Sequence, residues 1–391
     1  MIANGQPKYR SVGVLLSGRE QFSPYFGGAL ARWTYEVYSR LSGRVEVVVF
    51  GFPTKKTNLY PLRHETSKVW RGCALVAMIP LARRYDEMLW LRALIRRLRR
   101  FDAVHVHNRP QWVAVLRRMG YEGAIVLHLQ NDHLGHWSGS ALDALAHGLN
   151  ALVVCSDYLR STVASKSALL DAKTHVVFNG ANLQLFYPRE EVREPKTIFF
   201  VGRFDPQKGV LQLLQAYERV LDAHPDAKLV IAGTTGFGTH RETPYVYQVR
   251  ELAHSLEKNK HAQIHFKGYL DHDKDLPLWF QKATVFACPS LFQEPFGLVN
   301  AEAMACATTV VGANRGGIPE VIGNAGRLVD PENIEEFAAA ISELLAKPEY
   351  CRGLGQAGYQ RCREMFDWRV TAETWVTLLD RAGSLGSSSI Y

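Results

Sequence analysis

Two glutamates that lie eight residues apart, Glu294 and Glu302, are spaced for chemistry on an elongated ligand. Residues 285–290 have the apolar, β-branched character of a strand, and residues 298–305 are typical of a helix. Glu294 therefore precedes the helix and Glu302 lies inside it. At about 1.5 Å of rise per helical residue, the two carboxylates are too far apart to share a proton. The spacing favours hydrogen bonds to hydroxyl groups at two places on one ligand, such as a sugar ring and a ribose.

The turn between these glutamates predicts an anion site. A Pro-Phe-Gly sequence at 295–297 leads directly into the helix, and we expect Phe296, Gly297 and Leu298 to lie in its first turn. Backbone N–H groups in the first turn have no partner inside the helix and carry partial positive charge, so they can bind a phosphate group.

A second segment supplies side-chain cations. An apolar run at 197–201 ends in Gly202, after which Arg203 and Lys208 flank a Pro-containing turn that ends in Gly209. Arginine offers a planar fork of donors and lysine a compact charge, and together they suit a diphosphate whose negative charge must be neutralised as it departs. No cofactor is predicted, and no divalent metal is required at this site.

Together the two segments resemble the retaining nucleotide-sugar glycosyltransferases of family 4, which have the two-domain GT-B fold. In that family a Gly-Arg…Lys-Gly pattern and a Glu-x7-Glu pattern grip the donor, and they match Gly202, Arg203, Lys208 and Gly209, and Glu294 with Glu302. The resemblance is dense over residues 197–330. It implies catalytic roles for Arg203, Lys208 and Glu294, and donor contacts from Gly27, Gly28, Gly202, Gly268, Tyr269, Leu270, Phe296, Gly297, Leu298 and Glu302.

The elements that must position these residues are strands alternating with longer helical stretches, which predicts α/β domains with parallel sheets. The candidate strands are 11–17, 44–50, 75–79, 103–107, 124–129, 151–155, 175–178, 197–201, 228–232, 263–267, 284–287, 308–312 and 326–329. The pattern lapses near residues 186–195, where two prolines occur. We therefore expect two Rossmann-like, doubly wound domains facing across a cleft: an acceptor-side domain at 1–188, a nucleotide-sugar-binding domain at 189–365, and a C-terminal helix at 366–391 that crosses back to the first domain.

Polar residues at the ends of two strands in the first half are candidates for the acceptor side of the cleft. They are His107, Asn108, His128, Gln130 and Asn131. Family members usually have a histidine that closes the second of these strands, where this chain has Gln130. His128 lies two residues earlier on the same face of the strand, so either residue can take that role.

Net charge is +8 and is concentrated in the first half, where residues 1–190 hold 25 Lys and Arg against 13 Asp and Glu. The densest run, 91–100, has leucines at helical spacing and arginines on the opposite face. This pattern is that of a solvated helix packed on its own domain, and it also permits contact with an anionic membrane. No aromatic and basic platform for nucleic acid is evident.

Targeting signals are absent from the sequence pattern. No run of about 18 uncharged apolar residues occurs, the N-terminus lacks an apolar signal core, and six scattered cysteines suggest neither a zinc ribbon nor a disulfide framework. The acidic run at 271–275 lacks the Gly and Glu of a calcium loop, so no metal site is predicted there. These features predict a cytoplasmic protein, with contact at the inner face of the cell membrane as a hypothesis.

The resemblance implies a hexosyltransferase. It would move a sugar from a nucleoside diphosphate donor, UDP-sugars being favoured, to a hydroxyl of a glycan or lipid-linked acceptor, with retained configuration and without a metal. The segment 23–38 and the His-Asn-Arg loop at 107–109 are also similar to those of transferases for spore-coat or envelope polysaccharides, so we expect a role in envelope polysaccharide or lipopolysaccharide synthesis. Three alternatives remain open at this stage: a nucleotide-sugar epimerase, a phosphorylase, which would carry a lysine for pyridoxal phosphate in a longer chain, and a non-catalytic sugar- or lipid-binding protein of the same fold.

Overall fold

The structure is a computed structural model that describes residues 11–16, 20–23, 28–51, 60–66, 80–235 and 242–385. The chain divides into two compact units: residues 1–178 with 371–391, and residues 179–370. The sequence predicted boundaries at 188/189 and 365/366. The residues from 371 onward belong to the first unit, and the chain passes between the units at 178/179 and 370/371.

The first unit is built on a seven-stranded parallel sheet in the order β3-β2-β1-β4-β5-β6-β7. Its strands are β1 (Ser11–Leu15), β2 (Glu46–Gly51), β3 (His64–Thr66), β4 (Ala103–His107), β5 (Ala124–Leu129), β6 (Ala151–Val154) and β7 (Thr174–Val176). Its helices are α1 (Ala29–Arg40), α2 (Pro80–Leu98), α3 (Pro110–Arg118), α4 (Gly139–Gly148), α5 (Asp157–Ala164) and α6 (Ala168–Asp171), together with most of α14 (Trp368–Leu385).

The second unit has a six-stranded parallel sheet in the order β10-β9-β8-β11-β12-β13. Its strands are β8 (Thr197–Val201), β9 (Lys228–Ala232), β10 (Gln263–Gly268), β11 (Val285–Cys288), β12 (Thr309–Ala313) and β13 (Gly326–Val329). Its helices are α7 (Val210–Ala223), α8 (Pro244–Lys260), α9 (Leu276–Lys282), α10 (Leu298–Ala305), α11 (Ile318–Ile322), α12 (Ile334–Ala346) and α13 (Pro348–Met365), with 3-10 turns η2 (Glu190–Val192) and η3 (Pro206–Lys208).

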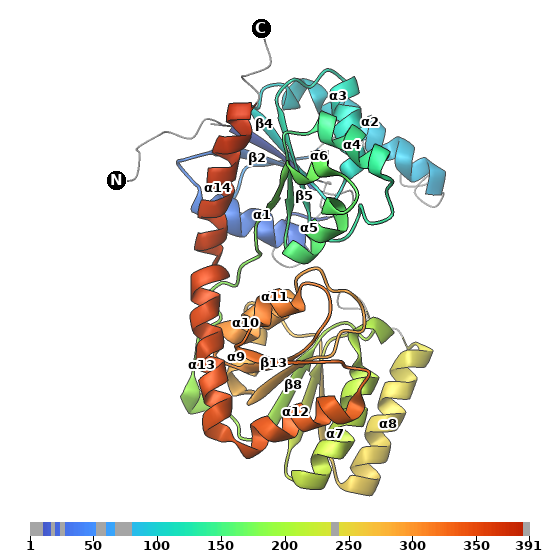
Figure 1. The fold of residues 1–391 in the computed structure, drawn as a ribbon, viewed down its shortest axis with the longest axis vertical. Coiled ribbons are helices and arrows are strands. Elements are labelled where there is room, and N and C mark those ends of the chain that lie inside the picture. Colours follow the sequence, from blue (N-terminus) through green and yellow to red (C-terminus); the bar gives the residue numbers. More distant parts are fainter. Residues whose placement is uncertain are drawn as a thin grey trace. The chain divides into compact units, whose positions relative to one another are not determined.

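Helices cover both faces of the second sheet, which explains why its central strands β8, β11 and β12 are almost continuously apolar. Alternate residues of β8 point to opposite faces: Ile198 and Phe200 enter the core formed with α7, α8 and α12. Phe199 lies on the other face, with its ring centroid 5.4 Å from that of Phe280 in α9. Figure 1 shows the helices of this unit arranged in two layers around the strands.

The strand predictions are confirmed closely where the structure describes the chain. Residues 103–107, 124–129, 197–201, 228–232 and 326–329 match observed strands at both ends. The short edge strand β3 was not predicted, and the predicted strand at 75–79 lies outside the described residues. Parallel strands buried on two faces carry the strongest sequence signal, because nearly every position in them is apolar.

Candidate functional site

The two segments that the sequence singled out follow neighbouring strands in the middle of the second sheet. Successive strands extend outward from β8 on one side and from β11 on the other, so the junction of β8 and β11 is the topological switch point. Ligands of open α/β sheets bind outside the carboxyl ends of strands at such a point. Gly202 and Arg203 follow β8, and the loop from Ser290 to Glu294 follows β11.

Backbone contacts join these two loops. The N–H of Leu291 donates to the carbonyl of Gln207 over 2.8 Å. Gly209, the N-cap of α7, lies in the left-handed region at φ 70° and approaches the Pro289 carbonyl so closely that a Cβ would lie 2.0 Å from its oxygen. A glycine is therefore needed here for both its backbone conformation and its small size.

The side chains of Lys208 and Glu294 meet where the loops join. Lys208 Nζ lies 2.9 Å from Oε1 and 3.1 Å from Oε2 of Glu294, and the side chains are 19% and 14% exposed. Ser290 Oγ donates to the same carboxylate over 2.6 Å. Lys208 Nζ also lies 4.8 Å from the ring centroid of Phe292. The lysine that was expected to face the diphosphate is thus held in place by Glu294 and Phe292, and Ser290 in turn fixes the carboxylate.

The anion site at the start of α10 differs in one respect from the prediction. The helix begins at Leu298 with Gly297 as its N-cap, at φ 81°, so Phe296 lies before the helix and not in its first turn. Phe296 is buried, with its ring edge-on to Phe366 at 5.6 Å. No side chain among the described residues caps this helix end. The amides that follow Gly297 are therefore the ones placed to bind an anion.

Glu302 is held inside the second unit by a histidine that the sequence analysis did not assign to the site. The carboxylate is buried, and its Oε1 lies 2.7 Å from His272 Nε2. His272 Nδ1 in turn lies 2.7 Å from Asp273 Oδ1. The sequence could have identified His272 as a site residue, because it comes soon after β10, at the carboxyl edge of the sheet.

Arg203 lines a pocket of about 190 Å³ at the carboxyl ends of β8, β9 and β10. The pocket also contains three residues predicted to contact the donor: Gly202, Tyr269 and Leu270. The Arg203 side chain is 56% exposed, and its Nη1 lies 3.7 Å from Asp205 Oδ2. Tyr269 is likewise exposed. An exposed cation and an exposed aromatic ring therefore flank one small hollow, open to a ligand that needs both charge neutralisation and stacking.

A turn at 315–317 supports the loop that carries Glu294. Arg315 Nη1 donates to the Leu291 carbonyl over 2.7 Å and Nη2 to Asp330 over 2.8 Å. The N–H of Gly317 donates to the Glu294 carbonyl over 2.7 Å. The loop after β11 is thus fixed from both sides, so the position of Glu294 is determined by the fold.

In the first unit, the predicted glycine pair lies before α1. Gly27 is outside the described residues, whereas Gly28 is the N-cap of α1. Its N–H donates to Glu20 Oε1 over 2.6 Å, and the N–H of Ala31 donates to the same oxygen over 3.1 Å. Burial raises the pKa of the Glu20 carboxyl, and the two backbone donors oppose that shift. A carboxylate of the chain itself therefore occupies this helix end, and a phosphate group could bind there only by displacing it.

The acceptor candidates gather at the carboxyl ends of β4 and β5, beside the switch point of the first sheet, which lies between β1 and β4. The N–H of Gln130 donates to Asn108 Oδ1 over 2.7 Å, and Gln130 Nε2 lies 2.8 Å from His128 Nε2. His107 and His128 are fully buried, whereas Asn131 is exposed. The structure thus brings four of the five candidates together but leaves only Asn131 fully open to solvent.

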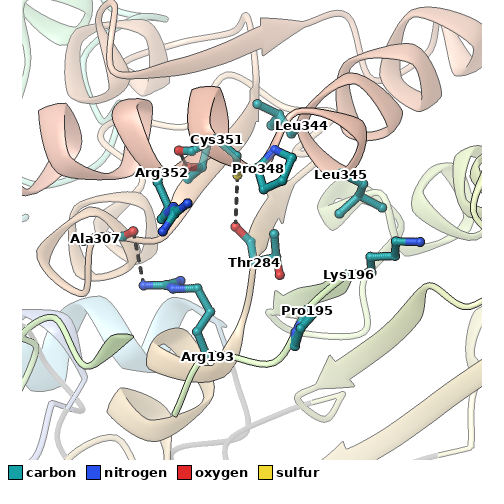
Figure 2. A pocket seen from close by; sticks show the side chains of 11 residues that line it. Arg193, Pro195, Lys196, Thr284, Ala307, Leu344, Leu345, Pro348, Cys351 and Arg352 are labelled. Carbon is teal, nitrogen blue, oxygen red and sulfur yellow. Dashed lines mark hydrogen bonds between the residues drawn. The ribbon is translucent and has the colours of Figure 1, made fainter. Parts of the chain in front are cut away.

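A larger pocket, of about 300 Å³, lies at the opposite edge of the second sheet (Figure 2). Lys196, Thr284 and Thr309 mark the amino ends of β8, β11 and β12, and Leu344 and Leu345 add an apolar wall. Arg193 points across it to the Ala307 carbonyl, and Cys351 Sγ contacts the Thr284 carbonyl. Because this pocket adjoins the amino ends of the strands, it is separate from the site at the switch point.

Two further features of the described residues bear on the sequence predictions. The five cysteines among them are buried thiols. Burial raises the pKa of Cys288 to about 11, which favours the protonated form. Within the described ranges, no helix is both long and apolar enough to cross a membrane.

The fold and the paired cation and carboxylate at the switch point define the class of protein: two parallel-sheet α/β domains of the GT-B glycosyltransferase type. Residues 26–185 match the family described as Glycosyltransferase Family 4, and residues 186–361 match Glycosyl transferases group 1. The chain belongs to glycosyltransferase family 4.

Individual relatives agree with this assignment. The chain is 32% identical over 306 residues to spore coat protein SA of Bacillus subtilis, covering 72% of this chain and 79% of that protein. It is 34% identical over 247 residues to α-maltose-1-phosphate synthase of Mycolicibacterium smegmatis, covering 57% of this chain and 61% of that enzyme. The fold is also that of Anabaena Alr3699/HepE, solved with UDP and glucose, at a TM-score of 0.72 and 18% identity over 95% of this chain and all of that one.

Proposed function

We propose that the protein transfers a sugar from a UDP-sugar to a hydroxyl of a glycan or lipid-linked acceptor, with retained anomeric configuration, in the synthesis of an envelope polysaccharide or lipopolysaccharide. One observation carries the proposal: Lys208 and Glu294 are paired at 2.9 Å at the topological switch point, beside the uncapped start of α10. A diphosphate placed there meets a cation and backbone amides, and its sugar meets a carboxylate.

Each residue then has a distinct part in the reaction. Lys208, Arg203 and the amides that follow Gly297 stabilise the charge that develops on the departing diphosphate, which is electrostatic catalysis by donors already in position. Glu294 accepts hydrogen bonds from sugar hydroxyls. Glu302, held by His272, accepts hydrogen bonds from the ribose. The departing phosphate takes the acceptor proton, so neither glutamate acts as a nucleophile and no metal is needed at the diphosphate.

The choice of UDP rests on the exposed Tyr269 at the pocket of Arg203 and on the UDP bound in HepE. A spore coat protein among the relatives favours an acceptor in a surface polysaccharide. The donor nucleotide and the acceptor are both selected by loops outside the diphosphate-binding residues, and substrate choice within one fold depends on such loops.

The test is a binding and turnover screen of the purified chain. Calorimetry with UDP, GDP, ADP and their sugars should show UDP and one UDP-sugar binding, and the Lys208→Ala variant should bind both more weakly. With a glycan acceptor, the chain should release UDP at a rate that added Mg²⁺ or Mn²⁺ leaves unchanged, and NMR should show retained configuration in the product. Binding of no nucleotide would overturn the assignment, and epimerised donor as the sole product would replace transfer with epimerisation.

Peripheral membrane contact is a separate part of the proposal, supported by the arginines of α2. Leu91, Leu94 and Leu98 are buried, whereas Arg92 and Arg96 are exposed on the same helix. The leucines therefore pack on the first unit and leave the charges available to anionic lipid. The double variant Arg92→Glu/Arg96→Glu should lose co-sedimentation with vesicles containing phosphatidylglycerol, while Lys258→Glu, at an exposed position of α8, should not. Equal binding of the wild type to neutral and anionic vesicles would contradict this contact.

A further inference from the structure

Three histidines form a buried cluster in the first unit, and the proposed transfer reaction assigns no step to this cluster. His105 and His107 lie on β4 and His128 lies on β5, and all three side chains are fully buried. One nitrogen from each ring lies within 4.8 Å of the corresponding nitrogens of the other two. The edge of Trp33 packs on all three rings, and Trp375 packs on two of them. The cluster joins two neighbouring strands at the end that carries the acceptor candidates.

Each ring has one nitrogen bound to a polar side chain from outside the cluster. Thr34 Oγ1 lies 3.0 Å from His107 Nε2, Tyr38 Oη lies 3.0 Å from His105 Nδ1, and Gln130 Nε2 lies 2.8 Å from His128 Nε2. The nitrogens left are His107 Nδ1, His105 Nε2 and His128 Nδ1. A histidine that binds a metal through one ring nitrogen donates the N–H of the other to an outer acceptor that fixes the ring. The oxygens of Thr34 and Tyr38 can accept such a hydrogen bond, whereas the Gln130 amide must turn so that Oε1 instead of Nε2 faces His128.

The hydroxyl of Thr34 determines which nitrogen of His107 carries the proton. Thr34 Oγ1 donates its only proton to the Leu30 carbonyl over 2.8 Å, so toward His107 it can act only as an acceptor. Nε2 of His107 therefore carries the hydrogen, and Nδ1 carries a lone pair. That Nδ1 is buried and has no hydrogen-bond partner among the described residues. A buried lone pair without a donor is costly, and a bound cation would satisfy it.

The spacing of the other two nitrogens also fits a metal. His105 Nε2 and His128 Nδ1 are 3.3 Å apart. Two nitrogens that each lie about 2.1 Å from a tetrahedral zinc ion are separated by about 3.4 Å. Three neutral imidazoles suit zinc and its neighbours among the divalent transition metals, whereas magnesium and calcium prefer oxygen ligands.

We propose that His105, His107 and His128 bind one divalent transition metal of the zinc type, which cross-links β4 and β5 in the first unit. The site is structural and is distinct from the diphosphate site of the second unit. The competing arrangement is a chain of hydrogen bonds from Tyr38 through His105 and His128 to Gln130, which needs no metal but leaves His107 Nδ1 unsatisfied.

The experiment uses the full chain, stripped with a chelator and dialysed, with Zn²⁺ and Co²⁺ as probes. Competition with a chromophoric chelator should show one zinc bound per chain, and Co²⁺ should give the visible absorption of a nitrogen-ligated ion. His107→Leu should abolish both signals. His254→Leu, which removes an exposed histidine of α8, should leave both unchanged and so controls for adventitious surface binding.

A second variant keeps the test decisive if His107→Leu does not fold. Thr34→Val retains all three imidazoles and nearly the same volume but removes the acceptor that fixes His107, so zinc affinity should fall about 10- to 100-fold. The metal site is refuted if the stripped wild type takes up no zinc, or if the zinc that it takes up is lost in His254→Leu. It is equally refuted if Thr34→Val binds zinc as tightly as the wild type.

Discussion

Lys208 Nζ lies 2.9 Å from Glu294 Oε1 although 86 residues separate them in the chain. Both residues belong to loops that follow central strands of the second sheet, and the contact exists because the switch point makes β8 and β11 neighbours. Each charge neutralises the other in a largely buried position. The diphosphate of a donor that binds here must therefore contact a lysine that is already paired with Glu294. The sugar of the same donor must contact a glutamate that is already paired with Lys208.

Loss of the cations should reduce catalysis strongly. Lys208→Ala or Arg203→Ala removes a donor aimed at the leaving diphosphate, so kcat/KM for the UDP-sugar should fall roughly a hundredfold or more, as for loss of an oxyanion-hole donor. Steady-state kinetics measure this. Lys196→Ala is the matched control, because Lys196 bonds Asp226 near the amino end of β8 and that variant should keep near-normal activity. Normal kinetics in Lys208→Ala would remove the role assigned to the lysine.

Glu294→Gln should separate sugar recognition from diphosphate binding. The neutral amide no longer attracts Lys208, which becomes fully available to phosphate, so the Kd for UDP should not increase. Hydrogen bonds to charged groups contribute about 1.5–3 kcal/mol, so kcat/KM for the UDP-sugar should fall about ten- to a hundredfold. Calorimetry with UDP and kinetics with UDP-sugar report the two effects.

Ser290→Ala provides the companion measurement for that prediction. It removes a hydroxyl that donates to the same carboxylate but leaves both charges in place. Its loss of activity should be smaller than that of Glu294→Gln. A large loss of UDP affinity in Glu294→Gln would show instead that the glutamate supports the diphosphate site.

The sequence predicted the second unit well because its signals are local. Each strand is an apolar run, and α10 was placed at residues 298–305, where the structure has it. The meeting of Lys208 with Glu294 was also foreseeable, since residues that follow neighbouring parallel strands gather at one edge of the sheet. The prediction that Phe296 and Gly297 lie in the first turn was wrong: Gly297 is the left-handed N-cap, and Phe296 is buried before the helix begins.

Supporting contacts from distant segments could not be predicted in the same way. His272 bonds Glu302 across 30 residues, and Glu20 accepts a hydrogen bond from the amide of Gly28, eight residues later. Neither residue belongs to a motif, and single polar residues in loops carry no periodic signal. The cluster of His105 with His107 and His128 depends on tertiary register between β4 and β5, which pairs His107 with His128 and which composition does not reveal.

Tyr217 should make stability depend on alkaline pH. Burial raises the pKa of Tyr217 to about 12, and its hydroxyl donates to the Ala227 carbonyl over 2.7 Å. The folded-state pKa lies above the unfolded value near 10, so the contribution of this hydroxyl is complete below pH 10 and is lost as pH rises through 12. Tyr217→Phe should cost about 1 kcal/mol at pH 8. By urea unfolding, the difference from the wild type should shrink at pH 11, and a constant difference would contradict the assignment.

Gly316→Ala and Gly43→Ala should separate backbone strain from close packing at the site. Both glycines lie in the left-handed region, at φ 61° and 80°, so an alanine costs each about 1 kcal/mol of backbone energy. A Cβ at Gly43 meets no atom within 4 Å, whereas one at Gly316 would lie 2.3 Å from the Glu294 carbonyl oxygen and must push that loop away. Urea unfolding should therefore show a larger loss of stability for Gly316→Ala. Calorimetry should show weakened UDP-sugar binding for Gly316→Ala alone, because only this variant displaces the carboxylate of Glu294. Equal donor affinity in the two variants would mean that the loop after β11 does not position the sugar.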